Sequence, residues 1–91
     1  MGEEEIKKYL AELKTAWEVL EGKKLRREFK FTDFEEAIIF VNKVAKLAES
    51  EGHHPDINIF YNLVVIELWT HAVGGLSEND FILAAKIEEL A

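Results

Sequence analysis

The chain has no cysteine among its 91 residues. Disulfides, thiolate nucleophiles and cysteine-based zinc sites are therefore excluded. Long hydrophobic runs are also missing, because the apolar stretches are only a few residues long and a membrane span needs roughly 20. The acidic start from Met1 to Glu5 has the character of neither a signal peptide nor a membrane anchor. We expect a soluble, cytoplasmic protein that makes no membrane contact.

Basic side chains are scarce as well. Lysine and arginine total 11 against 18 aspartates and glutamates, which leaves a net charge of −7. Phosphate backbones are bound by clustered Lys and Arg, so we expect no direct nucleic-acid ligand. The one basic cluster, Lys23 to Arg27, falls in a predicted hairpin and is interpreted as a solvated strand face. Within it, Arg27 interrupts an apolar face and either extends to solvent along its stem or lines a pocket.

Hydrophobic and aromatic residues are plentiful by comparison, at 48% and 11% of the chain. This composition is typical of a packed globular protein, and the length fits a single domain, which we assign to residues 1–91. A chain this short buries roughly two-thirds of its extended surface on folding. Association with further copies would therefore add stability.

The spacing of apolar residues predicts three helices and four strands. Helical periodicity covers three stretches, at about 3–14, at 32–52 and from Ser77 onward. Alternation of apolar and polar residues covers four stretches. Two lie between Trp17 and Phe31 around a turn at Gly22, and two lie at 57–61 and 63–71 around a turn near Asn62. We predict an α+β fold of order α-β-β-α-β-β-α, a four-stranded antiparallel sheet with three helices packed on one face.

The stretch 32–52 carries more apolar surface than one sheet can cover. Thr32 and Glu35 fit a capping box at its start, and Gly52 suits the position after its end. Its apolar residues form two stripes, Phe34, Ile38, Val41 and Ala45 on one side and Phe40, Val44 and Leu47 on the other. The excess predicts a helix-mediated homo-oligomer, a dimer or more specifically a homotetramer, weakened by Phe40→Glu or Val44→Glu.

All three histidines fall within one 19-residue span: His53, His54 and His71. Imidazole, with an unperturbed pKa of about 6.5, donates and accepts protons near neutrality. Glu49 lies one helical turn before His53, which predicts a carboxylate–imidazole pair. A hairpin that returns to the edge where it began would also bring His71 toward the double histidine. The region is therefore interpreted as a proton-transfer site.

Other interpretations of these residues stay open. Adjacent histidines at a helix end are commonly solvated, and Asp80 fits the third position of the last helix, where it would close a capping box. Trp17 and Trp69 either pack in the core or stack on a flat heterocycle. Three histidines and a carboxylate could also bind zinc. Neighbouring imidazoles cannot easily aim at one ion, so we expect no metal.

The spacing also resembles a known family. The string Glu49-x3-His53-His54-Pro55-x5-Tyr61-x9-His71-x8-Asp80 is similar to the signature of pterin-4a-carbinolamine dehydratases, as are Trp17, Phe29-Lys30-Phe31-x2-Phe34 and Gly75-Leu76-Ser77-x2-Asp80. The resemblance runs from about Trp17 to Leu90. Some members have an acidic residue directly before the double histidine. This chain has Gly52 there and lacks that second carboxylate.

The resemblance implies a hydro-lyase that converts 4a-hydroxytetrahydropterin into quinonoid dihydropterin in tetrahydrobiopterin recycling, without metal or organic cofactor. It implies His53 and His54 as proton donors near the 4a-hydroxyl and His71 as the base near N5, with Glu49 holding His53. Four further residues are expected to contact the pterin: Asp80, Trp17, Trp69 and Thr70.

Non-enzymatic roles are an alternative that the resemblance also brings. Family members in animals act as partners of a homeodomain transcription factor through a helical surface, and family dimers pair into tetramers through helices. A pterin-binding protein could likewise keep the fold without the reaction. We expect a small-molecule pterin and further copies of the chain as partners.

Overall fold

The computed structural model describes all 91 residues, Met1 to Ala91. The elements follow the chain in this order: α1 (Glu3–Glu12), β1 (Glu18–Leu20), β2 (Lys24–Lys30), α2 (Phe34–Glu51), β3 (Asp56–Phe60), β4 (Leu63–Leu68), a short 3₁₀ helix η1 (His71–Val73) and α3 (Glu78–Glu88). The predicted order α-β-β-α-β-β-α is confirmed. None of the helices combines the length and the apolar character needed to cross a membrane.

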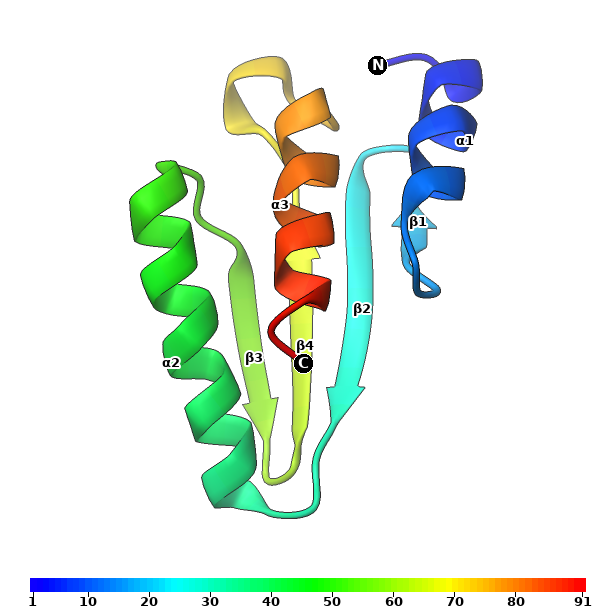
Figure 1. The fold of residues 1–91 in the computed structure, drawn as a ribbon. Coiled ribbons are helices and arrows are strands. Elements are labelled where there is room, and N and C mark those ends of the chain that lie inside the picture. The colour runs from blue at the N-terminus through cyan, green and yellow to red at the C-terminus, as the bar shows by residue number, and fades with distance from the viewer.

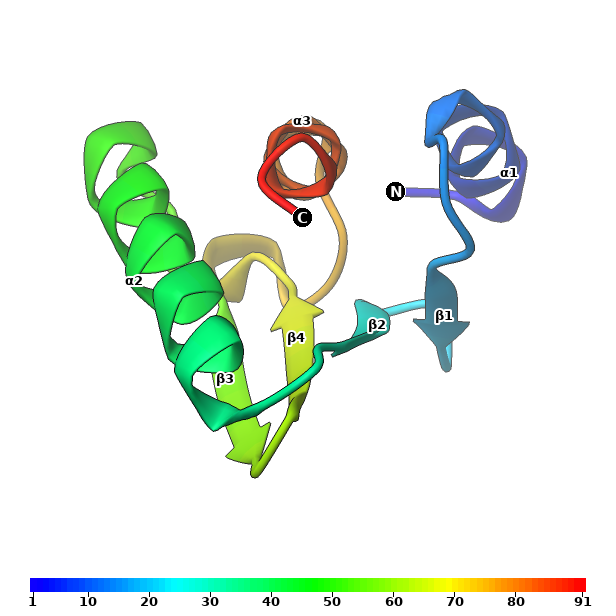
Figure 2. The same ribbon diagram turned by 60° about the horizontal axis from the view of Figure 1, so that its bottom comes forward.

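The four strands form one antiparallel sheet in the order β1-β2-β4-β3. Two hairpins, β1–β2 and β3–β4, are joined by the central pairing of β2 with β4. Figure 2 shows the three helices as one layer over the sheet, with α3 between α2 and α1. The predicted packing of all three helices on one face of the sheet is therefore confirmed (Figure 1).

Alternation along the two central strands builds the core. Leu25 pairs with Leu68 and Phe29 with Val64 across β2 and β4, and these side chains are buried in one cluster with residues of the helices. The last helix contributes Leu83, Ala84 and Ile87 to this cluster. Each fully buried side chain of the larger apolar types contributes roughly 1.5–3 kcal/mol relative to exposure.

The long helix α2 begins slightly later than its sequence predicts. Asp33 is the N-cap in place of Thr32, and its carboxylate accepts a hydrogen bond from the Glu36 amide at 2.8 Å. The Glu36 carboxylate accepts in turn from the Thr32 amide at 3.2 Å, so the predicted pairing of Thr32 with Glu35 is wrong by one residue. Aspartate competes well for this position because its short carboxylate reaches the amide directly. Gly52 ends α2 in the left-handed region, with a φ of 66°, as predicted.

Of the two apolar stripes predicted for α2, the sheet covers the one that contains Phe40 and Val44. Phe40 and Val44 are 3% and 0% exposed and belong to the core cluster, so they face the sheet. The exposed positions are Phe34 at 51% and Ile39 at 49%. The predicted subunit contact through Phe40 and Val44 is therefore wrong. A glutamate at either position would place an unpaired charge in the core and destabilise the fold itself.

Candidate active site

Three segments that lie far apart in the sequence meet at one end of the sheet. The link between α2 and β3, the helix η1 and the start of α3 all lie at the upper end in Figure 1. His53 and His54 belong to the first segment, His71 to the second and Asp80 to the third. The β3–β4 hairpin produces this arrangement, because an antiparallel partner returns to the edge where the first strand began.

His53 pairs with Asp80 and not with Glu49, which corrects the prediction. Its Nε2 lies 2.5 Å from Oδ1 of Asp80; the His53 side chain is 19% exposed and that of Asp80 0%. The second carboxylate oxygen, Oδ2, accepts hydrogen bonds from Thr70 Oγ1 at 2.8 Å and from the Ser77 amide at 2.9 Å. The bond to Ser77 is the capping contact predicted for α3. Asp80 therefore serves the helix start and the imidazole at once.

Glu49 pairs with His54 instead. Its Oε2 lies 2.5 Å from Nε2 of His54, and both side chains are exposed, at 77% and 64%. The one-turn spacing between Glu49 and His53 has meaning only within a helix, and α2 ends at Glu51. The left-handed Gly52 then changes the chain direction, so that His53 contacts α3 and His54 contacts the carboxylate on α2.

His71 begins η1, whereas its sequence context predicts the end of a strand. β4 stops at Leu68, and Thr70 forms only an isolated bridge with Gly75. No hydrogen bond joins His71 to the other two histidines. The connection between the two parts of the site runs through the neighbour of His71, since Thr70 donates to Asp80, which contacts His53.

The His71 ring packs on an indole. Its centroid lies 3.9 Å from that of Trp69, and Nζ of Lys24 lies 5.3 Å from the Trp69 ring centroid. His71 is exposed and Trp69 is half-buried. The two rings are tilted by 38° to each other, and because His71 is exposed, its ring is available for contact with another flat ring.

Trp17 lies in the core, apart from this cluster. Its side chain is buried edge-on to Phe29, with ring centroids 5.9 Å apart, and its Nε1 donates to Glu88 at 3.0 Å. The same carboxylate accepts hydrogen bonds from the amides of Lys14 and Thr15 at 3.1 and 2.8 Å and from the Thr15 hydroxyl. Trp17 thus helps to hold the loop after α1 against α3. Its buried ring has no free face for a heterocycle, so Trp17 does not belong to the proposed site.

Two charged groups near Trp17 have displaced pKa values. Burial of Glu88 by itself raises its pKa, but the hydrogen bonds from Thr15, Lys14 and Trp17 outweigh that effect and hold the pKa below its usual value.

Burial lowers the pKa of Arg27, against the attraction of Glu88. The Arg27 guanidinium lies over the Phe29 ring, 4.0 Å from its centroid, and its Nη1 is buried without a hydrogen bond. The sequence left two interpretations of Arg27 open. The structure does not support a pocket-lining role, because Arg27 lines none of the hollows.

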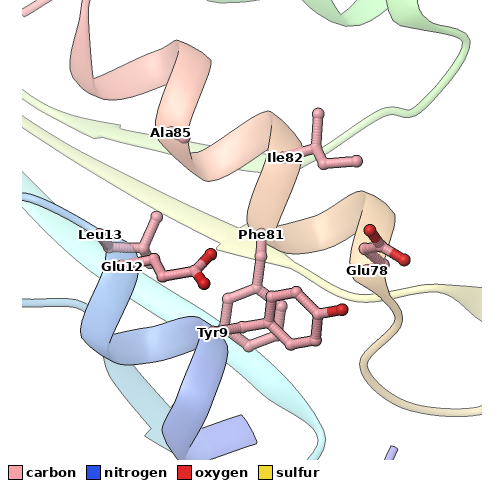
Figure 3. A pocket seen from close by; sticks show the side chains of 7 residues that line it. All are labelled: Tyr9, Glu12, Leu13, Glu78, Phe81, Ile82 and Ala85. Atoms are coloured by element: carbon pink, nitrogen blue, oxygen red, sulfur yellow. The ribbon is translucent and has the colours of Figure 1, made fainter. Parts of the chain in front are cut away.

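A hollow of about 120 Å³ adjoins His53. The residues that line it come from the end of α2 and the start of α3, and they are Glu51, Gly52, His53, Asn79, Ile82 and Leu83. A larger hollow of about 230 Å³ lies between α1 and α3, where the rings of Tyr9 and Phe81 stack with centroids 5.5 Å apart (Figure 3). No predicted site residue lines the larger one. The hollow beside His53 is therefore the candidate ligand site.

The chemistry available at this end of the molecule is proton transfer. No three histidine, aspartate or glutamate side chains lie close enough together to hold a metal ion. Each imidazole has a partner of its own, Asp80 for His53, Glu49 for His54 and Trp69 for His71. Imidazoles held in this way can exchange protons with a bound molecule.

The sequence did not predict which carboxylate each histidine contacts, nor most of the residues that line the hollow. The bond between His53 and Asp80 joins residues 27 positions apart, so no local spacing could show it. Asn79, which lines the hollow, gave no signal beyond its place in a helix start. A hint for Asp80 did exist, since a carboxylate in the first turn of an apolar helix is a candidate for burial with a partner.

Fold and site together define a class: an α+β domain with a buried carboxylate–histidine pair beside a small hollow. Residues 1–90 match the family model described as pterin 4 alpha carbinolamine dehydratase. A protein of Rickettsia canadensis is 52% identical over 84 residues, covering 92% of this chain and 77% of that protein. One of Alkaliphilus metalliredigens is 45% identical over 89 residues, covering 98% and 80%. Both are named "Putative pterin-4-alpha-carbinolamine dehydratase". The chain belongs to the pterin-4a-carbinolamine dehydratase family, as its motifs predicted.

Solved structures agree with this assignment. The crystal structure of a transcriptional coactivator/pterin dehydratase from Brucella melitensis superimposes with a TM-score of 0.92 at 35% identity, covering 100% of this chain and 97% of that one. A pterin dehydratase-like protein described as a RuBisCO assembly factor in the alpha-carboxysome gives a TM-score of 0.74 at 26% identity, covering 86% and 92%. The fold is thus shared by proteins that are described by different roles.

Proposed function

We propose that this protein removes water from a 4a-hydroxytetrahydropterin by histidine general acid–base catalysis, giving the quinonoid dihydropterin in tetrahydrobiopterin recycling. Family membership supports the dehydratase chemistry. The observation that carries the site assignment is His53, held by the buried carboxylate of Asp80 beside a hollow.

The reaction needs one acid and one base. Hydroxide leaves C4a only when an acid protonates it, and the neighbouring N5 must lose its proton to a base. The products are the quinonoid dihydropterin and water, and the proton taken from N5 replaces the one given to the hydroxyl. Each such transfer by a positioned side chain contributes about 10²–10⁴-fold to the rate.

His53 and His54 are the proposed acids and His71 the proposed base. Asp80 orients His53, and Glu49 orients His54, so each carboxylate also compensates the positive charge of an imidazolium. This assignment changes the role of Glu49, which was first expected to hold His53 and is now proposed to hold His54. The exposed ring of His71, packed at a tilt against Trp69, offers the pterin a flat surface.

A dehydratase assay with chemically generated 4a-hydroxytetrahydropterin tests the proposal. We expect the wild type to accelerate loss of the 4a-hydroxyl compound over the buffer rate, and His71→Ala to abolish most of that acceleration. Circular dichroism of both proteins controls for folding. A folded wild type that gives no acceleration would rule out the dehydratase function.

A binding role without catalysis is the second candidate. It is favoured by the structural similarity to a protein described as a RuBisCO assembly factor, at 26% identity. The two candidates separate in one comparison, because a pure binding role leaves the folded protein inactive in the assay and indifferent to His71→Ala.

We also propose that the chain forms a homotetramer. Phe34 and Ile39 are exposed on α2, which is the outermost helix of the layer on the β3 side in Figure 2. Exposed apolar side chains on one helix are typical of a contact surface. Ile39→Glu should lower the mass measured by light scattering, whereas Ile82→Glu, at an exposed isoleucine on α3, should not. A wild-type mass of 10.5 kDa, that of one chain, would contradict self-association.

A further inference from the structure

The hydrogen bonds around Asp80 run in one direction. A carboxylate only accepts, so the three groups that contact Asp80 all donate: Nε2 of His53 to Oδ1, and the Thr70 hydroxyl and Ser77 amide to Oδ2. Thr70 has one hydroxyl proton, and Asp80 accepts it. The Ser77 hydroxyl, 2.8 Å from Thr70 Oγ1, therefore donates to Thr70. The result is a chain from Ser77 through Thr70 to Asp80.

This direction determines which nitrogen of His53 can react. With the Nε2 proton committed to Asp80, Nδ1 is the nitrogen that remains for exchange with a bound molecule. His53 lines the candidate hollow, so the chain of donors orients a ring that faces the ligand site. The Asp80 side chain is itself 0% exposed, and both of its oxygens have protein donors. It is badly placed to contact a substrate directly.

Thr70 also holds the segment that carries His71. Its amide donates to the Gly75 carbonyl at 2.8 Å, and its carbonyl accepts from the amides of Val73 and Gly75 at 3.2 and 3.4 Å. These bonds close the loop of residues 71–74. The side chain of Thr70 therefore acts on His53 through Asp80, while its backbone acts on the loop of His71.

We propose that Thr70 is a positioning residue, which works with Asp80 to set the His53 ring relative to His71, and that neither contacts the pterin. This replaces the substrate-binding roles first expected for both. The catalytic consequence rests on the proposed dehydratase function, whereas the effect on the His53 ring does not.

Thr70→Val and Thr70→Ser form a matched pair that tests the role. Valine keeps the shape of threonine but lacks the hydroxyl, so Asp80 loses one donor and the Ser77 hydroxyl loses its acceptor; serine keeps both bonds. Small displacements of reacting groups cost up to about 10²-fold in rate. We expect Thr70→Val to lower kcat by about 10- to 10²-fold with KM close to wild type, and Thr70→Ser to stay close to wild type in both.

A second measurement is independent of turnover. In protein labelled with ¹⁵N-histidine, the Nε2 proton of His53 should give a downfield NMR resonance that exchanges slowly with water, because its acceptor is buried. We expect the resonance to persist in Thr70→Ser and to be lost or broadened in Thr70→Val. The exposed His54, whose pair with Glu49 lies outside the chain of hydrogen bonds to Asp80, serves as the internal reference, and we expect its ring resonances to be the same in both variants.

The outcomes are distinct. A Thr70→Val protein that keeps both the resonance and the wild-type kcat would overturn the proposal. If the variants show the expected resonance changes but the wild type has no dehydratase activity, the positioning role is supported and the proposed dehydratase function is refuted. If Thr70→Val does not fold, Thr70→Ala removes the same hydroxyl with a smaller side chain, and an unchanged resonance and kcat in that variant would equally overturn the proposal.

Discussion

Two carboxylate–imidazole pairs lie at the same end of this molecule and have the same length. His53 and Asp80 are 2.5 Å apart, and so are His54 and Glu49. The first pair sits under the start of α3, where Asp80 is 0% exposed, while the second is on the surface, with Glu49 77% exposed. Equal distances therefore conceal different energetics.

Burial accounts for the difference. An exposed pair competes with water, is screened by salt and contributes about 0–1 kcal/mol. A buried carboxylate must have its hydrogen bonds satisfied by the protein, and a lost partner leaves an uncompensated group. Asp80 meets this demand with three donors. We infer that the His53 pair holds a defined geometry, whereas the His54 pair is an adjustable surface contact.

The largest expected effects concern the proposed acid and base. His53→Ala and His71→Ala should each lower kcat/KM by at least about 10²-fold, because each removes a proton-transfer group. Steady-state kinetics on both variants, with circular dichroism to establish folding, provides the measurement. Near-wild-type turnover in both variants would contradict the mechanism.

Asp80→Asn and Glu49→Gln compare the two pairs directly. An amide at 80 has only one acceptor oxygen, so its NH₂ group must face either His53 or the Thr70 and Ser77 donors. We expect a loss of about 1–3 kcal/mol in the free energy of unfolding from this buried mismatch. Glu49→Gln, which water can satisfy, should cost about 1 kcal/mol or less. Urea unfolding of both variants tests whether burial or distance determines how much each pair contributes to stability. Equal losses of stability would favour distance.

A third carboxylate, Glu88, should show a smaller effect that depends on pH. Its pKa in the folded protein is below the usual 4.5, because hydrogen bonds from Thr15, Lys14 and Trp17 outweigh the effect of burial. A lowered folded-state pKa adds stability above the unfolded-state value, and this stability is lost as the pH falls through the folded-state pKa. The stability difference between wild type and Glu88→Gln should therefore be greater at pH 7 than at pH 3, as measured by urea unfolding. A difference that does not change with pH would exclude ionisation of Glu88 as its source.

The elements were predictable because their signals are local. Alternation identified the four strands, helical spacing the three helices, and Gly52 and Ser77 the end of α2 and the start of α3. The errors are local too. Asp33 competes with the adjacent Thr32 for the cap, and β4 ends at Leu68 because Thr70 bonds with Gly75 across a loop.

The burial of α2 could not be read from its sequence. Both stripes are apolar and both contain a phenylalanine and a valine, so only packing against the sheet distinguishes the buried stripe from the other. Phe40 tilts against Phe29 and Phe31, with ring centroids 4.8 and 5.0 Å apart, and this contact directs its stripe inward. Phe34 and Ile39 are left outside as a consequence.

By itself, the sequence determined the order of the elements, the family and the set of polar residues that gather at one end of the sheet. Tertiary structure alone decided which of them are partners. The left-handed turn at Gly52 separates His53 from Glu49, and the position of α3 brings Asp80 to it across 27 residues. Such a pairing depends on where two elements meet in space, so the spacing of residues along one element cannot predict it.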